Sequence, residues 1–336
     1  MAEAKWSPGE LLKLSGSYWE VFTLHAGVKL DLFTLLGNRS MDAETVAAKA
    51  GADVRGTRLM LNALSAMGLL KKGEEAYENG TSASKFLDRN SESYIGHMIM
   101  HHHYLVDPWA QMDRAVRSGK PVSQRAAHGG DENQRREAFL MGMYNIASQQ
   151  APHIAAEIDL SDRKRLLDLG GGPGTYAIEF CSRNSKLEAV IYDLPTTQPY
   201  AEKTVAQYGL SSQISFCPGN YIKEDIGGRF DVVWLSHILH SEGPETCERI
   251  ISKAVRTLEP GGIILIHDFI LFDSMDGPLF PALFALNMLQ ATAEGQSYSQ
   301  RQITRMLHKA GVSNIERLAY SGPTDSGIIK GTVENP

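Results

Sequence analysis

A glycine-rich turn is the clearest chemical signal in this sequence. Gly170, Gly172 and Gly174 alternate behind a short apolar run that contains the acidic Asp168. Glycines at such a point let a ligand approach the backbone closely, and the unpaired N–H groups of the next helix can bind it. A tight turn without a ligand is the alternative. Glycine fills four of the five positions 170–174, which favours the ligand.

The spacing of these glycines distinguishes between cofactors. A dinucleotide-binding turn has the pattern G-x-G-x-x-G, and Thr175 stands where its last glycine belongs. The spacing therefore favours a ligand without a pyrophosphate, whose cationic and amino-acid ends lie near the turn.

Two later segments carry candidate contacts to a nucleoside. Asp193 follows the next apolar run, about 20 residues beyond the glycines, where a carboxylate can accept hydrogen bonds from both hydroxyls of a ribose. A helix-capping aspartate is the alternative. Gly219, Asn220 and Tyr221 follow a third apolar run. At that position Asn220 can hydrogen-bond to adenine and Tyr221 can pack on its ring.

The elements that must position these turns alternate between strand and helix from Arg165 onward. Apolar, β-branched runs separated by helical segments are typical of a parallel sheet covered on both faces. The pattern therefore predicts a doubly wound α/β domain. Its predicted strands are residues 165–169, 189–192, 214–216, 231–235 and 262–267.

The chain before residue 90 predicts three helices and then a hairpin, which is the order of a winged helix. A hydrophobic stripe from Val21 to Leu36 predicts the first helix, and residues 69–78 predict the hairpin. The charges are mixed and form no dense basic recognition helix. This favours a dimerisation domain over the alternative, a DNA-binding regulator that senses the nucleoside. Trp19 fits burial against another subunit.

The chain between the hairpin and the α/β domain again predicts helices. Pro108 predicts a helix that begins at Trp109, and Glu132–Glu157 predicts a long helix that is interrupted or ends near Pro152. His97 and His101 lie one helical turn apart and could share a metal ion, but no third ligand follows at a suitable spacing. We expect these histidines to line a pocket or pack in the core, and we expect no metal.

Composition limits the partners of the protein. The 336 residues include 33 basic and 39 acidic side chains, a net charge of -6, which argues against nucleic acid. Cys181, Cys217 and Cys247 show no C-x-x-C spacing and are typical of thiols in a reducing compartment. No apolar run approaches the roughly 20 residues that span a bilayer, and the first residues lack the pattern of a signal peptide. We expect a cytoplasmic protein with no membrane partner.

These motifs resemble those of the S-adenosylmethionine-dependent small-molecule O-methyltransferases, which include the caffeate and hydroxyneurosporene methyltransferases. The resemblance extends over nearly the whole chain. Asp168–Gly174 matches the glycine turn of the family, and Leu258–Gly262 matches its turn before the fifth strand. Asp193 with Leu194 matches the ribose-binding aspartate, which a Leu-Pro pair follows. The adenine-contacting pair of the family falls on the asparagine and tyrosine named above.

The resemblance implies a fold, a cofactor and partners. It implies a Rossmann-like class I methyltransferase sheet at residues 101–336, with residues 101–160 lining the acceptor pocket. A winged-helix-like dimerisation domain at residues 1–100 would precede it. The resemblance also implies a homodimer, S-adenosylmethionine as the cofactor and S-adenosylhomocysteine as its product. Ser236 stands where the family usually has a lysine and is a further candidate cofactor contact.

The resemblance also implies catalytic residues. The catalytic histidine of the family falls on His240, and His237 is the competing candidate. Because the sulfonium already activates the methyl group, the protein must align a nucleophile and remove a proton, which an imidazole titrating near neutral pH can do. Asp268 matches a glutamate that could hold the ring tautomer, or it only caps a strand end. Glu294 is a weak substitute for a second glutamate.

The reaction implied is methyl transfer to a phenolic or enolic hydroxyl of a small aromatic or heteroaromatic metabolite. N- or C-methylation, and hydroxylation, decarboxylation or cyclisation without methyl transfer, stay open on the same fold. The resemblance also implies an acceptor pocket that suits a flat ring, although each of its residues could belong to the core. The candidate pocket residues are Met100, His101, Tyr104, Trp109, Phe139, Met143, His237, Phe284, Asn287 and Met288.

Overall fold

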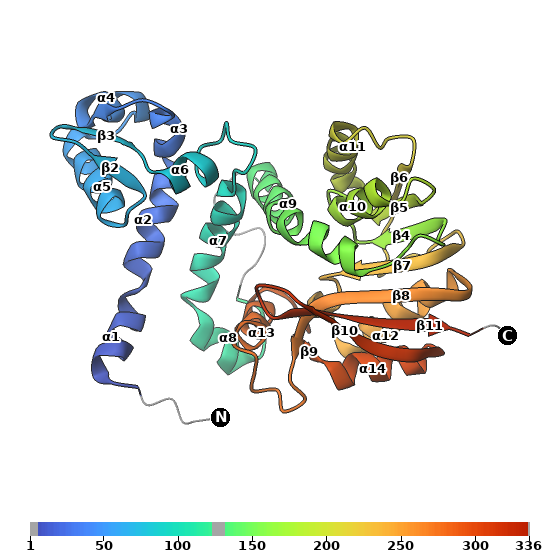
Figure 1. Cartoon of the computed structure of the whole chain (residues 1–336). Helices are drawn as coiled ribbons and strands as arrows, with labels where there is room; N and C mark the ends of the chain where they lie inside the picture. The colour runs from blue at the N-terminus through green and yellow to red at the C-terminus, as the bar shows by residue number, and fades with distance from the viewer. Residues whose placement is uncertain (1–5, 123–131, 335–336) are drawn as a thin grey trace. The chain divides into compact units, whose positions relative to one another are not determined.

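The computed structural model describes residues 6–122 and 132–334, and the chain divides into two compact units (Figure 1). The first unit contains the residues up to Tyr104 and Asn133–Asn145; the second contains Leu105–Glu132 and the residues from Ile146 onward. Helices α7 (Gly96–Trp109) and α9 (Glu132–Glu157) each contribute residues to both units. Residues 101–104 and 133–145 therefore pack in the first unit, beyond the boundary at residue 100 that the resemblance implies.

The first unit consists of short helices and a small antiparallel sheet. The strands follow the order β1-β3-β2, so the predicted hairpin of β2 and β3 is present and β1 extends it. The helix predicted over residues 21–36 is wrong in one respect. It is broken at Asp31, whose φ of 58° is a left-handed conformation that aspartate tolerates better than most residues. The elements are α1 (Pro8–Gly16), α2 (Tyr18–Lys29), α3 (Leu32–Leu36), β1 (Met41–Asp42), α4 (Ala43–Ala50), α5 (Val54–Ala66), β2 (Leu70–Lys72), β3 (Ala76–Asn79) and α6 (Thr81–Phe86).

One buried histidine, His25, and a group of partly buried ones on α7 make this first unit sensitive to acid. Burial, with a smaller contribution from neighbouring histidines, lowers the pKa of His25 and of His101 to about 4. Burial also lowers the pKa of His97 and of His102. An unfolded chain titrates these rings near pH 6.5 and so binds more protons than the folded one. Their stabilising effect is therefore complete above about pH 6.5 and is lost as the pH falls toward about 4.

We expect urea unfolding to show this loss. The free energy of unfolding should fall between about pH 7 and about pH 5, with His25 and His101 each contributing at most about 3 kcal/mol. A His25→Gln/His101→Gln double variant should show a shallower dependence on pH than the natural chain. Equal slopes for the two proteins would contradict the assignment.

The second unit is built on an eight-stranded sheet. Along its main path the strands follow the order β10-β11-β8-β7-β4-β5-β6, and β9 pairs with β8. The five strands from β8 to β6 are parallel, which confirms the doubly wound prediction; β10 and β11 are antiparallel additions that were not predicted. The strands are β4 (Arg165–Leu169), β5 (Glu188–Asp193), β6 (Ile214–Pro218), β7 (Phe230–Ser236), β8 (Leu258–Leu271), β9 (Tyr298–Ser299), β10 (Val312–Ser321) and β11 (Ser326–Val333).

Helices cover both faces of this sheet. On one face, α10 (Thr175–Arg183), α11 (Gln198–Gln207) and the last turns of α9 pack on alternate strand residues such as Leu166 and Trp234. On the other face, α12 (Pro244–Arg256) and α14 (Gln300–Lys309) pack on the intervening residues such as Leu167 (Figure 1). Burial on both sides explains why the strands read as continuous apolar runs.

Two local predictions need correction. Pro108 does not begin a helix: α7 continues through it to Trp109, because in the last turn proline removes a single helical hydrogen bond, and the next helix is α8 (Met112–Ser118). Strand β8 does not end at residue 267, because antiparallel pairing with β11 and parallel pairing with β9 carry it on to Leu271. Within the described residues, no helix combines the length and the apolar character needed to cross a membrane.

Candidate active site

The glycine turn between β4 and α10 has the shape that its sequence predicts. Gly170, Gly172 and Gly174 all have positive φ angles, of 70°, 55° and 82°. A Cβ atom on Gly170 or Gly174 would lie 2.2 or 2.4 Å from an isoleucine side chain, whereas one on Gly172 would meet nothing within 4 Å. Gly174 is the N-cap of α10 and supplies no side-chain cap. The turn therefore offers open space beside uncapped N–H groups.

Asp168 lies fully buried beneath this turn. Its Oδ2 accepts a hydrogen bond of 3.3 Å from the amide of Ala177, while its Oδ1 has no partner among the described residues. Burial raises the pKa of Asp168 to about 7. A ligand group that donates a hydrogen bond or carries positive charge would offset that cost of burial.

Asp193 at the end of β5 is tied to the glycine turn. Its Oδ2 accepts a hydrogen bond from the amide of Gly172 at 2.8 Å, and its Oδ1 accepts one from the amide of Leu194 at 2.6 Å. The hydroxyl of Thr197, which the sequence pattern did not indicate, also donates to Oδ1. Burial raises the pKa of Asp193 although these hydrogen bonds oppose the rise. The partly exposed carboxylate therefore has a fixed orientation at the carboxyl end of β5.

The segment after β6 lies beside the carboxyl end of β5. The amide of Gly219 donates to the backbone oxygen of Asp193 at 2.9 Å, and a Cβ on Gly219 would collide with the hydroxyl of Tyr192. Tyr221 reaches the glycine turn, since its Cε1 lies 3.4 Å from where a Cβ of Gly170 would be. Three predicted segments, after β4, β5 and β6, thus meet at the carboxyl ends of neighbouring strands.

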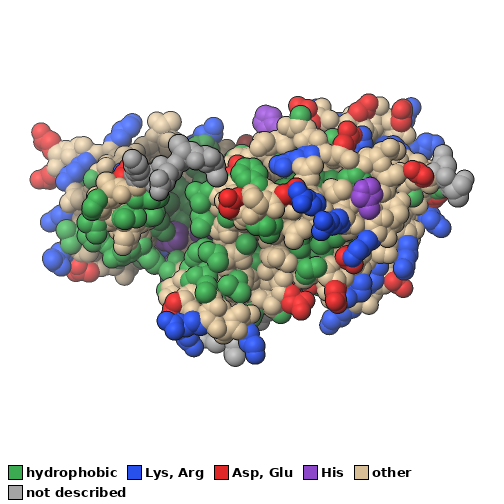
Figure 2. Space-filling model, turned by 90° about the horizontal axis from the view of Figure 1, so that it is seen from below, with side chains coloured by type: hydrophobic (Ala, Val, Ile, Leu, Met, Phe, Trp, Pro, Cys, Tyr) green, Lys and Arg blue, Asp and Glu red, His purple; other side chains and the backbone are tan. Residues whose placement is uncertain are grey.

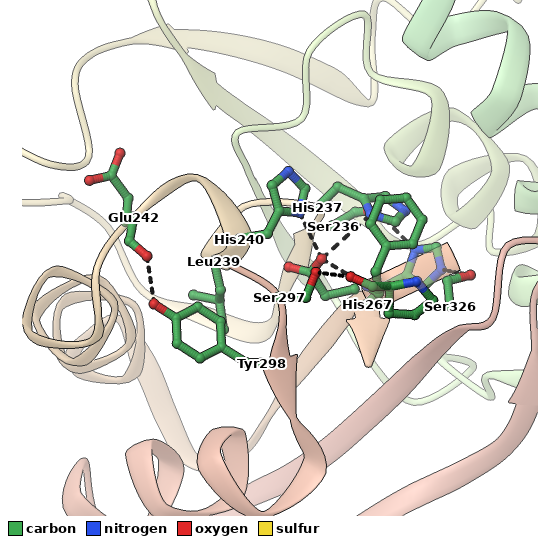
Figure 3. A network of polar contacts seen from close by, with 12 residues as sticks. Ser236, His237, Leu239, His240, Glu242, His267, Ser297, Tyr298 and Ser326 are labelled. Carbon is green, nitrogen blue, oxygen red and sulfur yellow. Dashed lines mark hydrogen bonds and ion pairs between the residues drawn. The ribbon is translucent and has the colours of Figure 1, made fainter. Parts of the chain in front are cut away.

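A histidine and an aspartate form a close pair at the ends of β7 and β8. His240 lies in the short helix η2 (Leu239–Ser241) and is 8% exposed. Its Nδ1 lies 2.7 Å from Asp268 Oδ1 (Figure 3). His237 has a φ of 58° and its Nδ1 is 3.7 Å from the same oxygen, too far for a hydrogen bond. Burial opposes ionisation of Asp268, but the two histidines outweigh it and hold the pKa of that carboxyl well below its usual range.

A second buried histidine, His267, stands beside this pair and engages Ser236. Its Nδ1 lies 3.0 Å from Ser236 Oγ and 3.4 Å from the hydroxyl of Tyr176 on α10. On the other side of the ring, Nε2 lies 3.1 Å from Ser326 Oγ (Figure 3). Burial lowers the pKa of His267, so the ring is neutral. The hydroxyl of Ser236 thus contacts His267 on the neighbouring strand β8, and its contact with the cofactor stays a prediction.

Comparison with known proteins gives two family matches that together cover most of the chain. Residues 109–313 match the O-methyltransferase domain, and residues 12–89 match the O-methyltransferase dimerisation domain. The chain belongs to the O-methyltransferase family. It is an S-adenosylmethionine-dependent O-methyltransferase with an N-terminal dimerisation domain.

Individual relatives agree over nearly full length. The chain is 30% identical to the tetracenomycin polyketide synthesis 8-O-methyl transferase TcmO of Streptomyces glaucescens, over 96% of each chain. It is 29% identical to the 3-hydroxy-5-methyl-1-naphthoate 3-O-methyltransferase of Streptomyces sahachiroi, over 96% of this chain and 95% of the relative. The solved structure of PigF, a Serratia methyl transferase, with S-adenosylhomocysteine superimposes with a TM-score of 0.89 at 25% identity, covering 97% of this chain and 100% of that one.

Aromatic side chains surround His237 and His240 of the methyltransferase. The ring of Phe284, on α13 (Leu279–Ala291), lies 4.8 Å from that of His240, edge to face. The ring of Phe269 contacts those of His237 and Phe284, and Phe280 adjoins it. The sequence pattern did not indicate Phe269, because the predicted strand stopped short of it, nor did it indicate Phe280 on α13.

The ten candidate pocket residues divide equally between the two units. In the second unit, Asn287 Oδ1 accepts a hydrogen bond of 2.9 Å from Trp109 Nε1. In the first unit, the rings of His101 and Phe139 lie 5.4 Å apart. The first unit contains Met100, His101, Tyr104, Phe139 and Met143, and the second contains Trp109, His237, Phe284, Asn287 and Met288.

Asp268 supplies the carboxylate next to His240, and these two residues together with His237 could in geometry hold a metal ion. Glu294 is exposed and lies against Gly243; among the contacts described for His240, the carboxylate is that of Asp268. The ligand atoms of His237, His240 and Asp268 lie within 4.8 Å of one another, close enough to hold a metal ion. A direct hydrogen bond of 2.7 Å within this group is the simpler arrangement, and it needs no ion.

Proposed function

We propose that this methyltransferase methylates a phenolic or enolic hydroxyl of a small aromatic compound, with His240 as the general base. The 2.7 Å contact between His240 Nδ1 and Asp268 Oδ1 carries the proposal. Asp268 is ionised, so it accepts a hydrogen bond from Nδ1–H of His240, and the lone pair of the ring is then on Nε2. When bound, S-adenosylmethionine supplies the electrophilic methyl group.

The residues of the chain then have to position a hydroxyl and remove its proton. Nε2 of His240 would accept the proton of the hydroxyl as the oxygen bonds to the methyl carbon and the bond from that carbon to sulfur breaks, and Asp268 would stabilise the resulting imidazolium. The rings of Phe284 and Phe269 exclude water from this pair and provide a flat apolar wall. We expect Asp193 to bind the ribose, Asn220 and Tyr221 to face adenine, and Asp168 to lie near the amino-acid end of the cofactor.

The curated relatives support a fused aromatic acceptor, because their names specify a hydroxynaphthoate and a polyketide, tetracenomycin. Mass spectrometry of reactions with hydroxynaphthoates and other hydroxylated aromatics tests the proposal. Each methylated product should be accompanied by an equal amount of S-adenosylhomocysteine. Matched compounds with an amine in place of the hydroxyl should stay unmodified. Methylation of the amines or of ring carbons would reassign the acceptor atom, and cofactor binding without any methyl transfer would favour the other chemistries.

We further propose that the first unit forms a homodimer through α1 and α2. Several large apolar side chains are exposed there, with Leu12 at 74% and Trp19 at 70%, and hydrophobic side chains gather over these helices in the face shown in Figure 2. Such a surface is typical of an interface. We expect light scattering to give twice the chain mass of 36.9 kDa. A Leu12→Glu/Trp19→Glu variant should be monomeric, whereas Val116→Glu, at an exposed position on α8, should stay dimeric.

A dimeric Leu12→Glu/Trp19→Glu variant would exclude this interface, and a monomeric natural chain would exclude the homodimer.

We also expect the methyltransferase to be cytoplasmic. We expect it not to bind nucleic acid, because its net charge is -6.

A further inference from the structure

One lysine, which lies outside the group formed by His237, His240 and Asp268, holds the turn that follows β6. Lys253 lies on α12, and its Nζ donates hydrogen bonds to three backbone oxygens, of Tyr221 at 3.3 Å, Ile222 at 3.2 Å and Glu224 at 2.7 Å. An ammonium has three N–H donors, so this one is fully used. The partly buried side chain therefore serves the turn rather than the solvent.

The same turn has its amides satisfied from the other side. The side-chain oxygen of Asn220 accepts hydrogen bonds from the amides of Ile222 and Lys223, and its backbone oxygen accepts from Lys223 and Glu224. The amides thus point at Asn220 and the carbonyls converge on Lys253. Without the ammonium, three carbonyl dipoles that converge on one point would lose the donor that holds them together, and the turn would be free to rearrange as water replaced it.

The position of this turn affects the cofactor site directly. Tyr221 is both a residue whose carbonyl Lys253 holds and the residue whose ring reaches the glycine turn at Gly170. Gly219, at the start of the turn, is hydrogen-bonded to the backbone of Asp193. A rearranged turn would therefore displace the ring that bounds the glycine turn.

We propose that Lys253 is a positioning residue for cofactor binding: it holds the 220–224 turn so that Asn220 and Tyr221 present a fixed surface to the adenine. The inference rests on the proposed function, which places adenine at this turn. Lys253 acts through the turn and touches neither the methyl group nor the acceptor. It should consequently govern the affinity for the cofactor and leave the chemical step unchanged.

The test compares Lys253→Met, which keeps the aliphatic stem, with Lys253→Arg, which keeps several donors. We expect Lys253→Met to raise the Kd for S-adenosylhomocysteine and the KM for S-adenosylmethionine by about tenfold or more, with kcat at saturation within about twofold of the natural enzyme. Lys253→Arg should recover most of the affinity. The control is Lys309→Met, which removes an exposed ammonium paired with Glu248 and should change neither constant.

Two further measurements separate the possible failures. Titration with adenosine alone should show the loss for Lys253→Met, because the effect lies at the nucleoside end. Tyr221→Ala reports whether the turn faces the cofactor at all. If Tyr221→Ala weakens binding and Lys253→Met does not, or if Lys253→Met lowers kcat alone, the role of Lys253 is overturned. If neither variant weakens binding, the adenine assignment fails with it. Should Lys253→Met not fold, Lys253→Gln takes its place under the same criteria.

Discussion

His240→Gln should bind S-adenosylhomocysteine as tightly as the natural enzyme and lose about 10²–10⁴-fold in kcat, the usual contribution of a positioned general base. Glutamine can still donate a hydrogen bond to Asp268, but it cannot take up a proton at neutral pH. The fold should survive the substitution, since glutamine is close to histidine in size and the ring packs on the aromatic side chains Phe284 and Phe269 outside the main cores of the sheet. Steady-state kinetics with an accepted phenol and calorimetric titration of the cofactor product check both parts.

His237→Gln is the matched control, because His237 lies 3.7 Å from the same carboxylate and makes no hydrogen bond with it. It should retain most of kcat. A variant series in which His237→Gln is inactive and His240→Gln active would reverse the assignment. We expect EDTA to leave the natural enzyme active. Loss of activity in EDTA that a divalent ion restores would assign the histidine group to a metal instead.

The parallel part of the sheet could be predicted because burial on both faces makes each strand a continuous apolar run. The antiparallel strands β10 and β11 could not, because β10 lies at the edge of the sheet and, apart from Val312, its residues are half-buried or exposed, so it forms no continuous apolar run. Because β11 was not predicted, the length of β8 at the site was not predicted either. Its pairing of Ser326 with Phe269 is what carries β8 past His267, so the extended backbone around Asp268 depends on a contact between distant residues.

Among the site residues too, those marked by the local sequence could be predicted, and those that depend on contacts between distant residues could not. The positions of Asp168 and Asp193 could be predicted from the sequence because each lies within or just beyond a recognisable strand, and parallel strands bring their ends together. His240 was indicated by the resemblance to the family. The contact of Ser236 with His267 could not be predicted, since it depends on the register between β7 and β8. Lys253 could not be found either. It is the one lysine of α12, and nothing in the sequence of that helix indicates that its ammonium meets three carbonyls of a remote turn.

Asp193→Ala should weaken S-adenosylhomocysteine binding by about 10²-fold, since two hydrogen bonds to a charged group contribute about 1.5–3 kcal/mol each and some compensation by water is expected. Its effect on kcat at saturating cofactor should be small, because Asp193 lies at the end of β5 and the proposed base lies beyond β7. Calorimetric titration measures the change in Kd. Thr197→Val, which removes a donor to Asp193 Oδ1 at 3.3 Å and leaves the carboxylate, should have a much smaller effect.

The same carboxylate also holds the glycine turn, through the 2.8 Å hydrogen bond from the amide of Gly172, so weaker binding alone would not prove a contact with ribose. Adenosine and its 2′-deoxy and 3′-deoxy forms separate the two roles. If Asp193 binds the hydroxyls, the natural enzyme should lose affinity for each deoxy form and Asp193→Ala should bind all three equally, so that the two changes are not additive. If Asp193 only holds the turn, removing a hydroxyl and removing the carboxylate should weaken binding independently, and the ribose assignment would be wrong.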